Sequence, residues 1–375
     1  MVHLSVAQLV PALDGGGVER GTLEVAQALT QRGHRSVVIS GNGRLVRQLL
    51  DEGSEHLRWP LGVKSPLTLR WIWPLRRWLA ERRIDILHAR SRLPAWIAWL
   101  AWRGMDPMTR PRFVTTVHGL YSVSRYSAIM TQGERVIAVS ETIRDYLRCH
   151  YPQLSAERIQ LIPRGVDAAQ FPYGYQPTVD WWAKWYRQYP QLRNEPVLTL
   201  PGRLSRLKGH EEFIELIARL RMQGLPIHGL IVGGVEPGRQ RYASQLQRRV
   251  QAQGLSNTVL FTGHRTDMRE IYAASTLVLS LSAKPESFGR TVLEALSLGT
   301  PVVGYEHGGV GEILRCIYPA GLTPVGNLDA LTQRTLNLLI AAPPVPAEPV
   351  FTRQRMLDDT LNLYETLSQS PRSRA

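Results

Sequence analysis

Residues 196–220 read PVLTLPGRLSRLKGHEEFIELIARL, and the order of residue types in this stretch indicates the fold class. The run 196–201 is short and apolar, as a buried strand is, whereas 211–220 repeats apolar residues at helical spacing. A loop with two glycines and three cations joins them. A strand, a loop and a helix in this order form the repeating unit of a parallel α/β sheet.

The same alternation of apolar runs and helical patterns continues along nearly the whole chain. It predicts two parallel sheets, each covered by helices on both faces. We expect strands near residues 3–11, 36–40, 84–89, 113–118, 135–139 and 158–162, and again near 196–201, 227–232, 258–262, 276–281 and 301–305.

The alternation breaks between about Asp167 and Pro196, and a second break, 341–349, carries four prolines that predict an extended linker. The helical pattern 352–368 after it has an apolar face that needs a partner surface. We therefore expect a first domain over 1–170, a linker over 171–195, a second domain over 196–350 and a final helical segment over 351–375.

Composition describes an ordinary globular protein of 375 residues with 43% hydrophobic residues. Its two cysteines, Cys149 and Cys316, are far apart and form neither a disulfide framework nor a metal-ligand cluster, which favours a reducing compartment. We see no secretory signal after Met1, and the longest apolar run, 93–102, is about half as long as a membrane-spanning helix. The expected location is the cytoplasm.

The net charge of +14 predicts anionic partners, namely nucleic acid, acidic lipid or phosphorylated substrates. Nucleic acid is the least favoured of these, because the chain has no zinc-finger spacing, no RNA-binding signature and no basic tail.

A first candidate site is the turn 14–20, DGGGVER, between the opening strand and a helix. Glycines here let backbone N–H groups approach an anion, and the helix N-terminus adds partial positive charge. The spacing is neither the dinucleotide fingerprint nor a P-loop, so a plain tight turn remains an equal alternative.

A second candidate is the loop 201–210, where Gly202-Arg203 precedes Lys208-Gly209. An arginine and a lysine in one loop can neutralise a diphosphate leaving group without a metal. The alternative is a solvated basic loop.

The stretch 284–301 is the most informative, since Glu286 and Glu294 flank the expected start of a helix. One carboxylate can accept hydrogen bonds from sugar hydroxyls and the other from ribose, while the exposed amides face phosphate. Alternatively, Glu286 complements the helix dipole and Glu294 lies on the surface.

This last segment resembles the motif of two glutamates separated by seven residues in retaining glycosyltransferases of family 4. The resemblance continues along the chain in the order of that family's motifs. The matching segments are Gly15-Gly16-Gly17-Val18-Glu19, Thr116-Val117-His118-Gly119, Gly202-Arg203 with Lys208-Gly209, Glu286 to Glu294, and Gly308-Gly309-Val310-Gly311-Glu312.

The resemblance implies a GT-B architecture of two facing Rossmann-like domains, with the final helix crossing back onto the first. It assigns catalytic roles to Arg203, Lys208, Glu286 and His118, although a histidine at a strand end is often only a hydrogen-bonding residue. Donor binding falls to Gly16, Gly17, Gly202, Ser287, Phe288, Gly289 and Glu294.

The resemblance further implies transfer with retention of anomeric configuration from a nucleotide sugar, with a UDP-sugar favoured over a GDP- or ADP-sugar. No Asp-x-Asp motif is present, so no metal is expected. The acceptor is expected to be a glycan or a lipid-linked sugar in lipopolysaccharide or envelope polysaccharide synthesis. A sugar-nucleotide epimerase, a nucleic-acid-binding protein and an inactive scaffold of the same fold are the alternatives.

Seven of the ten tryptophans lie between Trp59 and Trp102, among several arginines. A basic helix with Trp71, Trp73 and Trp78 is typical of a segment that lies on an anionic leaflet. Equally, Trp96, Trp99 and Trp102 could pack a helix into the core while the arginines are solvated. The sequence leaves both interpretations open.

Overall fold

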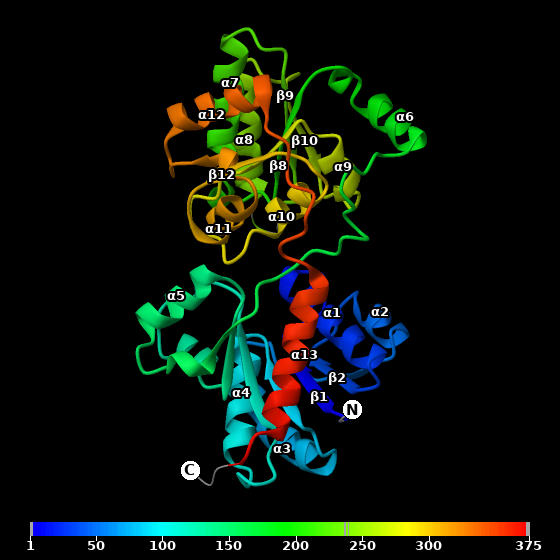
Figure 1. Ribbon diagram of the computed structural model, residues 1–375, viewed down its shortest axis with the longest axis vertical. Coiled ribbons are helices and arrows are strands. Elements are labelled where there is room, and N and C mark those ends of the chain that lie inside the picture. The colour runs from blue at the N-terminus through cyan, green and yellow to red at the C-terminus, as the bar shows by residue number, and fades with distance from the viewer. Residues whose placement is uncertain (1–2, 236–237, 239, 373–375) are drawn as a thin grey trace. The chain divides into compact units, whose positions relative to one another are not determined.

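The computed structural model describes residues 3–235, 238 and 240–372. These residues form two compact units, each built around one parallel sheet (Figure 1). The first unit comprises the described residues up to Pro163 together with those from Gln354 onward, and the second runs from Arg164 to Arg353. The prediction of two parallel sheets is confirmed.

Seven parallel strands form the first sheet, in the order β3-β2-β1-β4-β5-β6-β7. From β1 the chain adds strands first on one side (β2, β3) and then on the other (β4 to β7), so the strand order reverses between β1 and β4. Ligands of open α/β sheets bind at such a point. The strands are β1 (Ser5–Leu9), β2 (Arg35–Ser40), β3 (Glu55–Arg58), β4 (Ile86–Ala89), β5 (Arg112–Val117), β6 (Arg135–Ala138) and β7 (Ile159–Leu161).

Helices cover both faces of this sheet (Figure 1). They are α1 (Gly17–Gln31), α2 (Val46–Asp51), α3 (Ile72–Glu81), α4 (Arg92–Arg103), α5 (Glu141–His150) and α13 (Arg353–Gln369), with short 3-10 helices η1 (Pro66–Trp71), η2 (Ser127–Thr131) and η3 (Ala156–Arg158).

Helix α13 supplies its apolar face to the core of the first unit, where it lies beside α1 (Figure 1). Leu361 and Tyr364 are buried in one cluster with Leu4 and Leu29. The Tyr364 hydroxyl lies 2.6 Å from Nδ1 of the buried His88. The partner surface that the final helical pattern needs is thus the first sheet and α1.

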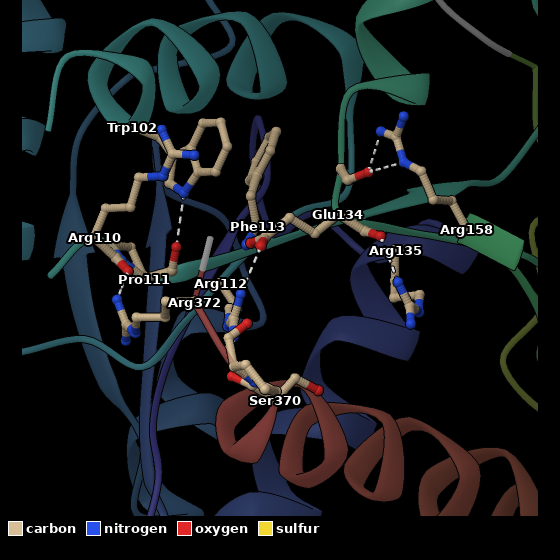
Figure 2. Close-up of polar contacts among 12 residues, drawn as sticks. Trp102, Arg110, Pro111, Arg112, Phe113, Glu134, Arg135, Arg158, Ser370 and Arg372 are labelled. Carbon is tan, nitrogen blue, oxygen red and sulfur yellow. Dashed lines mark hydrogen bonds and ion pairs between the residues drawn. The ribbon is translucent and has the colours of Figure 1, made fainter. Parts of the chain in front are cut away.

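Polar contacts tie the end of α13 to β5, as Figure 2 shows. The Arg112 guanidinium donates to the carbonyl oxygens of Ser370 and Pro371, and its other terminal nitrogen pairs with Glu134 at 2.9 Å. Glu134 also accepts from the Phe113 amide at 2.8 Å. These bonds fasten the residues directly after α13 to β5.

Six parallel strands form the second sheet, in the order β10-β9-β8-β11-β12-β13. The strands are β8 (Val197–Pro201), β9 (His228–Val232), β10 (Val259–Gly263), β11 (Leu277–Ser280), β12 (Val302–Tyr305) and β13 (Leu322–Thr323). The helices are α6 (Val179–Gln188), α7 (His210–Met222), α8 (Gln240–Ala252), α9 (Met268–Ala273), α10 (Arg290–Ser297), α11 (Gly308–Ile317) and α12 (Leu328–Ala341), with 3-10 helices η4 (Pro190–Leu192), η5 (Arg206–Lys208) and η6 (Pro319–Gly321).

Strands β3 and β13 were not expected from the sequence. Both lie at sheet edges, and β3 is exposed or half-buried throughout, while β13 has only two residues. Edge strands need no continuous apolar run, because one side of the strand is unpaired and open to solvent.

The expected linker 171–195 carries helix α6, which packs on the second sheet. Trp185 is buried in a cluster with Leu230 of β9, and the Trp181 indole donates to Asp267 at 2.8 Å. The proline-rich stretch has no helix or strand after Ala341, yet it also packs on this unit, since the Tyr173 hydroxyl donates to the Val345 carbonyl at 2.9 Å.

Candidate active site

The basic loop of the second unit follows β8 and has a tightly fixed backbone. Gly202 and Gly209 have φ angles of 147° and 73°, which favour glycine. A Cβ at Gly209 would lie 2.1 Å from the Leu281 carbonyl oxygen. The Leu207 carbonyl accepts from the Ala283 amide at 2.9 Å, so the loop is held at the carboxyl end of β11.

Lys208 and Glu286 form an ion pair at this sheet edge, with Nζ 2.6 Å from Oε1. The Ser282 hydroxyl donates to the same carboxylate oxygen, and the Glu286 carbonyl accepts from the Gly309 amide at 2.8 Å. Burial alone would raise the pKa of Glu286, but the charge of Lys208 and the bonds from Lys208 and Ser282 hold it below the ordinary value. The carboxylate is therefore ionised at neutral pH and fixed in direction.

The second carboxylate, Glu294, lies in α10 and is only 7% exposed. Arg290 donates to one of its oxygens at 2.9 Å, and the buried Tyr272 hydroxyl lies 3.2 Å from the other. Of the two interpretations left open by the sequence, the structure therefore excludes a surface carboxylate.

The predicted donor-binding loop leads directly into α10. Ser287 and Phe288 precede the helix, and Gly289 is its N-cap with a φ of 101°. Phe288 is buried, and its backbone packs closely against Gly309. A Cβ added at Gly309 would lie only 2.3 Å from the Phe288 Cα. The N-termini of α10 and α11 are thereby packed together next to Glu286, a favourable place for an anion.

Among the residues predicted from sequence, the structure brings Lys208 and Glu286 into contact. The Lys208 side chain also passes close to Gly202, since a Cβ added at Gly202 would lie 3.3 Å from Cδ of Lys208. Arg203 directly follows Gly202 on the same loop and is exposed.

Ser282 and His307 belong to the same cluster, and sequence reasoning missed them. Nε2 of His307 donates to the Ser282 carbonyl at 2.8 Å, and the positive charge of a protonated His307 would lower the pKa of Glu286 further. Both residues come within two positions of a strand end at this sheet edge. That position was the available signal, but serine and histidine are too common there to be distinctive.

His210 packs beneath the basic loop 201–210 and contacts its backbone. It is fully buried at the first position of α7, and its Nδ1 lies 3.2 Å from the Ser205 carbonyl oxygen. Burial lowers the pKa of His210 to about 4, so the ring is neutral at pH 7.

The glycine-rich turn of the first unit follows β1, and α1 begins at Gly17. The amides of Gly15 and Gly16 both donate to one carboxylate oxygen of Glu19, at 2.5 and 2.6 Å. The turn thus binds an anion, but that anion is the side chain of its own helix. The assignment of Gly16 and Gly17 to donor phosphate remains a prediction.

His118 lies at the carboxyl end of β5 in the first unit and is partly exposed. Its amide donates to the Tyr121 hydroxyl at 3.3 Å, and the Arg92 guanidinium lies over the Tyr121 ring. The catalytic role of His118 stays a prediction.

Two protein-family models match the chain, one in each half of the sequence. Residues 15–170 match the family model described as Glycosyltransferase Family 4, and residues 184–343 match that described as Glycosyl transferases group 1. A crystal structure of a glycosyltransferase from Rickettsia africae is 27% identical, with a TM-score of 0.86, over 98% of this chain and 100% of that one. The chain belongs to the GT-B glycosyltransferases.

This GT-B chain also shares its fold with Anabaena Alr3699/HepE, solved with UDP and glucose, at 22% identity and a TM-score of 0.76 over 98% of this chain and 95% of that one. Mannosylfructose-phosphate synthase from Agrobacterium fabrum is 34% identical over 183 residues. The match covers 47% of this chain and 38% of the synthase, so the chain spans less than half the length of that curated relative.

Proposed function

We propose that this chain transfers a sugar from a nucleotide-sugar donor to a glycan or lipid-linked acceptor with retention of anomeric configuration. The observation that carries the proposal is the fixed cluster of Lys208 and Glu286 beside the N-termini of α10 and α11. Cations and helix amides at one sheet edge suit a diphosphate, and oriented carboxylates suit hydroxyls.

The proposed roles follow from the chemistry of each group. Arg203 and Lys208 stabilise the negative charge that grows on the diphosphate as the sugar departs. Glu294 accepts hydrogen bonds from the ribose hydroxyls, and Glu286 with the amides of Phe288 and Gly289 holds the transferred sugar. Because these cations neutralise the leaving group, no metal is needed for the reaction.

In the proposed reaction, the bond between the anomeric carbon and the diphosphate oxygen breaks while the acceptor oxygen bonds to the same face of that carbon. The acceptor proton passes to the departing phosphate oxygen. Double displacement on Glu286 is disfavoured because Lys208 and Ser282 already bind that carboxylate. Isolation of a covalent sugar adduct on Glu286 would contradict this route.

We favour a UDP-sugar as donor, as in the Anabaena neighbour, and an acceptor from lipopolysaccharide or envelope polysaccharide synthesis. Use of a nucleotide sugar is consistent with action in the cytoplasm.

Incubation of the purified protein with UDP-, GDP- and ADP-sugars, with and without EDTA, tests the proposal. We expect release of nucleoside diphosphate with one donor class, undiminished by EDTA, and a product whose anomeric configuration by NMR is that of the donor. An epimerised donor would instead favour an epimerase. A donor that raises the melting temperature but undergoes no reaction would favour an inactive scaffold.

A further inference from the structure

The tryptophan-rich segment of the first unit divides into an inward set and an outward set. Trp59 stacks on Trp71 at 5.2 Å and meets Trp78 edge-on at 6.2 Å, and all three pack against the core. Trp102 is buried and donates to the Pro111 carbonyl at 2.7 Å. Trp73, by contrast, is 70% exposed. Of the three tryptophans expected at a leaflet, Trp71 and Trp78 therefore belong with the core, and Trp73 is the exposed one.

Three further exposed apolar side chains lie within ten residues of Trp73 in the sequence. Val63 and Leu69 are each about half exposed, and Leu67 is 70% exposed. With Trp73 they span eleven residues, and we name this group the η1 patch. Scattered exposed apolar residues are ordinary, but four within one short segment indicate a binding surface.

The backbone beneath the η1 patch is fixed. The Ser65 hydroxyl accepts from the Leu67 amide at 3.2 Å, and the Thr68 hydroxyl donates to the Val63 carbonyl at 2.6 Å. Arg76 donates to the Ala101 carbonyl at 3.2 Å and lies over the Trp73 ring. The apolar side chains are thus held outward by an anchored scaffold, so little ordering is needed when a partner binds.

Positive charge predominates in the segment that carries the patch. Lys64, Arg70 and Arg77 are exposed, and residues 59–80 contain no aspartate or glutamate. Glu81, the next acidic residue, pairs with Arg77 at 3.4 Å. A partner protein with an apolar face would not require this excess of cations, whereas an anionic bilayer offers apolar depth and phosphate together.

We propose that the η1 patch docks this protein on the surface of an anionic lipid bilayer, with Leu67 and Trp73 at headgroup depth and Arg70 and Arg77 on lipid phosphates. None of the helices in the described part of the chain has the length and apolar character needed to cross a bilayer. The inference rests on the proposed function in one respect, because a lipid-linked acceptor would be met at that surface.

Co-sedimentation with vesicles at low salt tests the docking. We expect the protein to bind vesicles of phosphatidylglycerol and phosphatidylcholine, and to bind pure phosphatidylcholine vesicles much less. The double variant Leu67→Ser with Trp73→Ser should lower the partition coefficient about tenfold or more, because two interfacial side chains are lost. Arg70→Gln with Arg77→Gln should abolish the preference for anionic vesicles.

A matched control is Met222→Ser with Ile340→Ser, which changes two apolar residues of the second unit that are 79% and 74% exposed. It should bind vesicles as the wild type does. The proposal would be overturned if the Leu67/Trp73 variant bound vesicles as well as the wild type, or if the wild type did not bind anionic vesicles. It would also be overturned if the wild type formed a dimer that this variant disrupts. Circular dichroism checks folding, and donor hydrolysis without vesicles, unchanged in every variant, separates docking from the proposed function.

Discussion

Two glycine-containing loops of this protein each follow the first strand of their sheet, and each contacts a carboxylate. They differ in where that carboxylate lies in the sequence. In the first unit, the turn after β1 closes on Glu19, three residues from Gly16. In the second, the loop after β8 places Lys208 against Glu286, 78 residues away.

The contact in the first loop is local in sequence, whereas the contact in the second loop depends on the tertiary fold. Glu19 supplies one half of a capping box, because its carboxylate accepts from the amide of the N-cap Gly16, which has no side chain to return the bond. The Lys208–Glu286 pair forms only after the second sheet has assembled, because Lys208 follows β8 and Glu286 follows β11. Ser282, which also follows β11, and His307, which follows β12, join it. We propose that the second loop is built for a ligand that shares Lys208 with Glu286, whereas a ligand of the first loop must displace Glu19 from the Gly15 and Gly16 amides.

Of the changes considered, replacement of Lys208 in the second loop should reduce activity most. In Lys208→Ala we expect kcat/KM for the donor to fall about 10²–10³-fold, because a group that stabilises the departing charge is lost. Initial rates of nucleoside diphosphate release measure the effect. Lys184→Ala, at an exposed position of α6, is the matched control and should retain wild-type kinetics. Normal activity of Lys208→Ala would remove this lysine from the mechanism.

Neutralisation of Glu286 should have the next largest effect. Glu286→Gln keeps the shape of the side chain but loses the charged partner of Lys208, so we expect donor turnover to fall about tenfold to a hundredfold. Glu215→Gln is the control, because this half-buried carboxylate of α7 likewise loses its ion pairs, with Arg219 and Arg249. Wild-type turnover in Glu286→Gln would mean that this carboxylate neither orients the sugar nor positions Lys208.

The sequence identified the central strands of both sheets because their buried, apolar runs are unambiguous, as β4 and β8 show. It missed β3, whose polar residues Glu55 and Arg58 match an edge position as well as they match a loop. It also left open which tryptophans are exposed, because the direction of Trp73 depends on how α3 packs its buried Leu75 and Leu79.

For the candidate site, motif spacing named Lys208 and Glu286 but could not show that they touch. Their contact depends on where β8 and β11 lie within the sheet, which no local pattern specifies. Glu19 appeared as part of a motif, but its bond to the Gly16 amide became visible only with the helix start fixed at Gly17.

The buried histidine behind the second loop gives a pH test that the first loop lacks. The pKa of His210 is lowered from 6.5 to about 4 by burial, so between these values the unfolded chain binds a proton that the folded chain does not. Stability should therefore fall as pH drops through this window, by up to about 3 kcal/mol for a change of about 2.5 pKa units.

Replacement of this side chain should remove that dependence. In His210→Gln we expect a flatter fall in unfolding midpoint between pH 6.5 and 4 than in the wild type, measured by thermal or urea denaturation. His264→Gln, at an exposed position after β10, should keep the wild-type slope. Parallel profiles for His210→Gln and the wild type would show that His210 is not held neutral by the fold.

The smallest effect is expected at the first loop. In Glu19→Ala the amides of Gly15 and Gly16 lose their internal acceptor, so the stability of the first unit should fall by about 0.5–2 kcal/mol. Donor KM should not rise, since a carboxylate that competes with phosphate for the Gly16 amide is gone. Glu157→Ala, an exposed change in η3, controls for loss of one negative charge. A clear increase of donor KM in Glu19→Ala alone would mean that Glu19 binds the donor directly, and the contrast between a self-capped turn and a ligand loop would then be wrong.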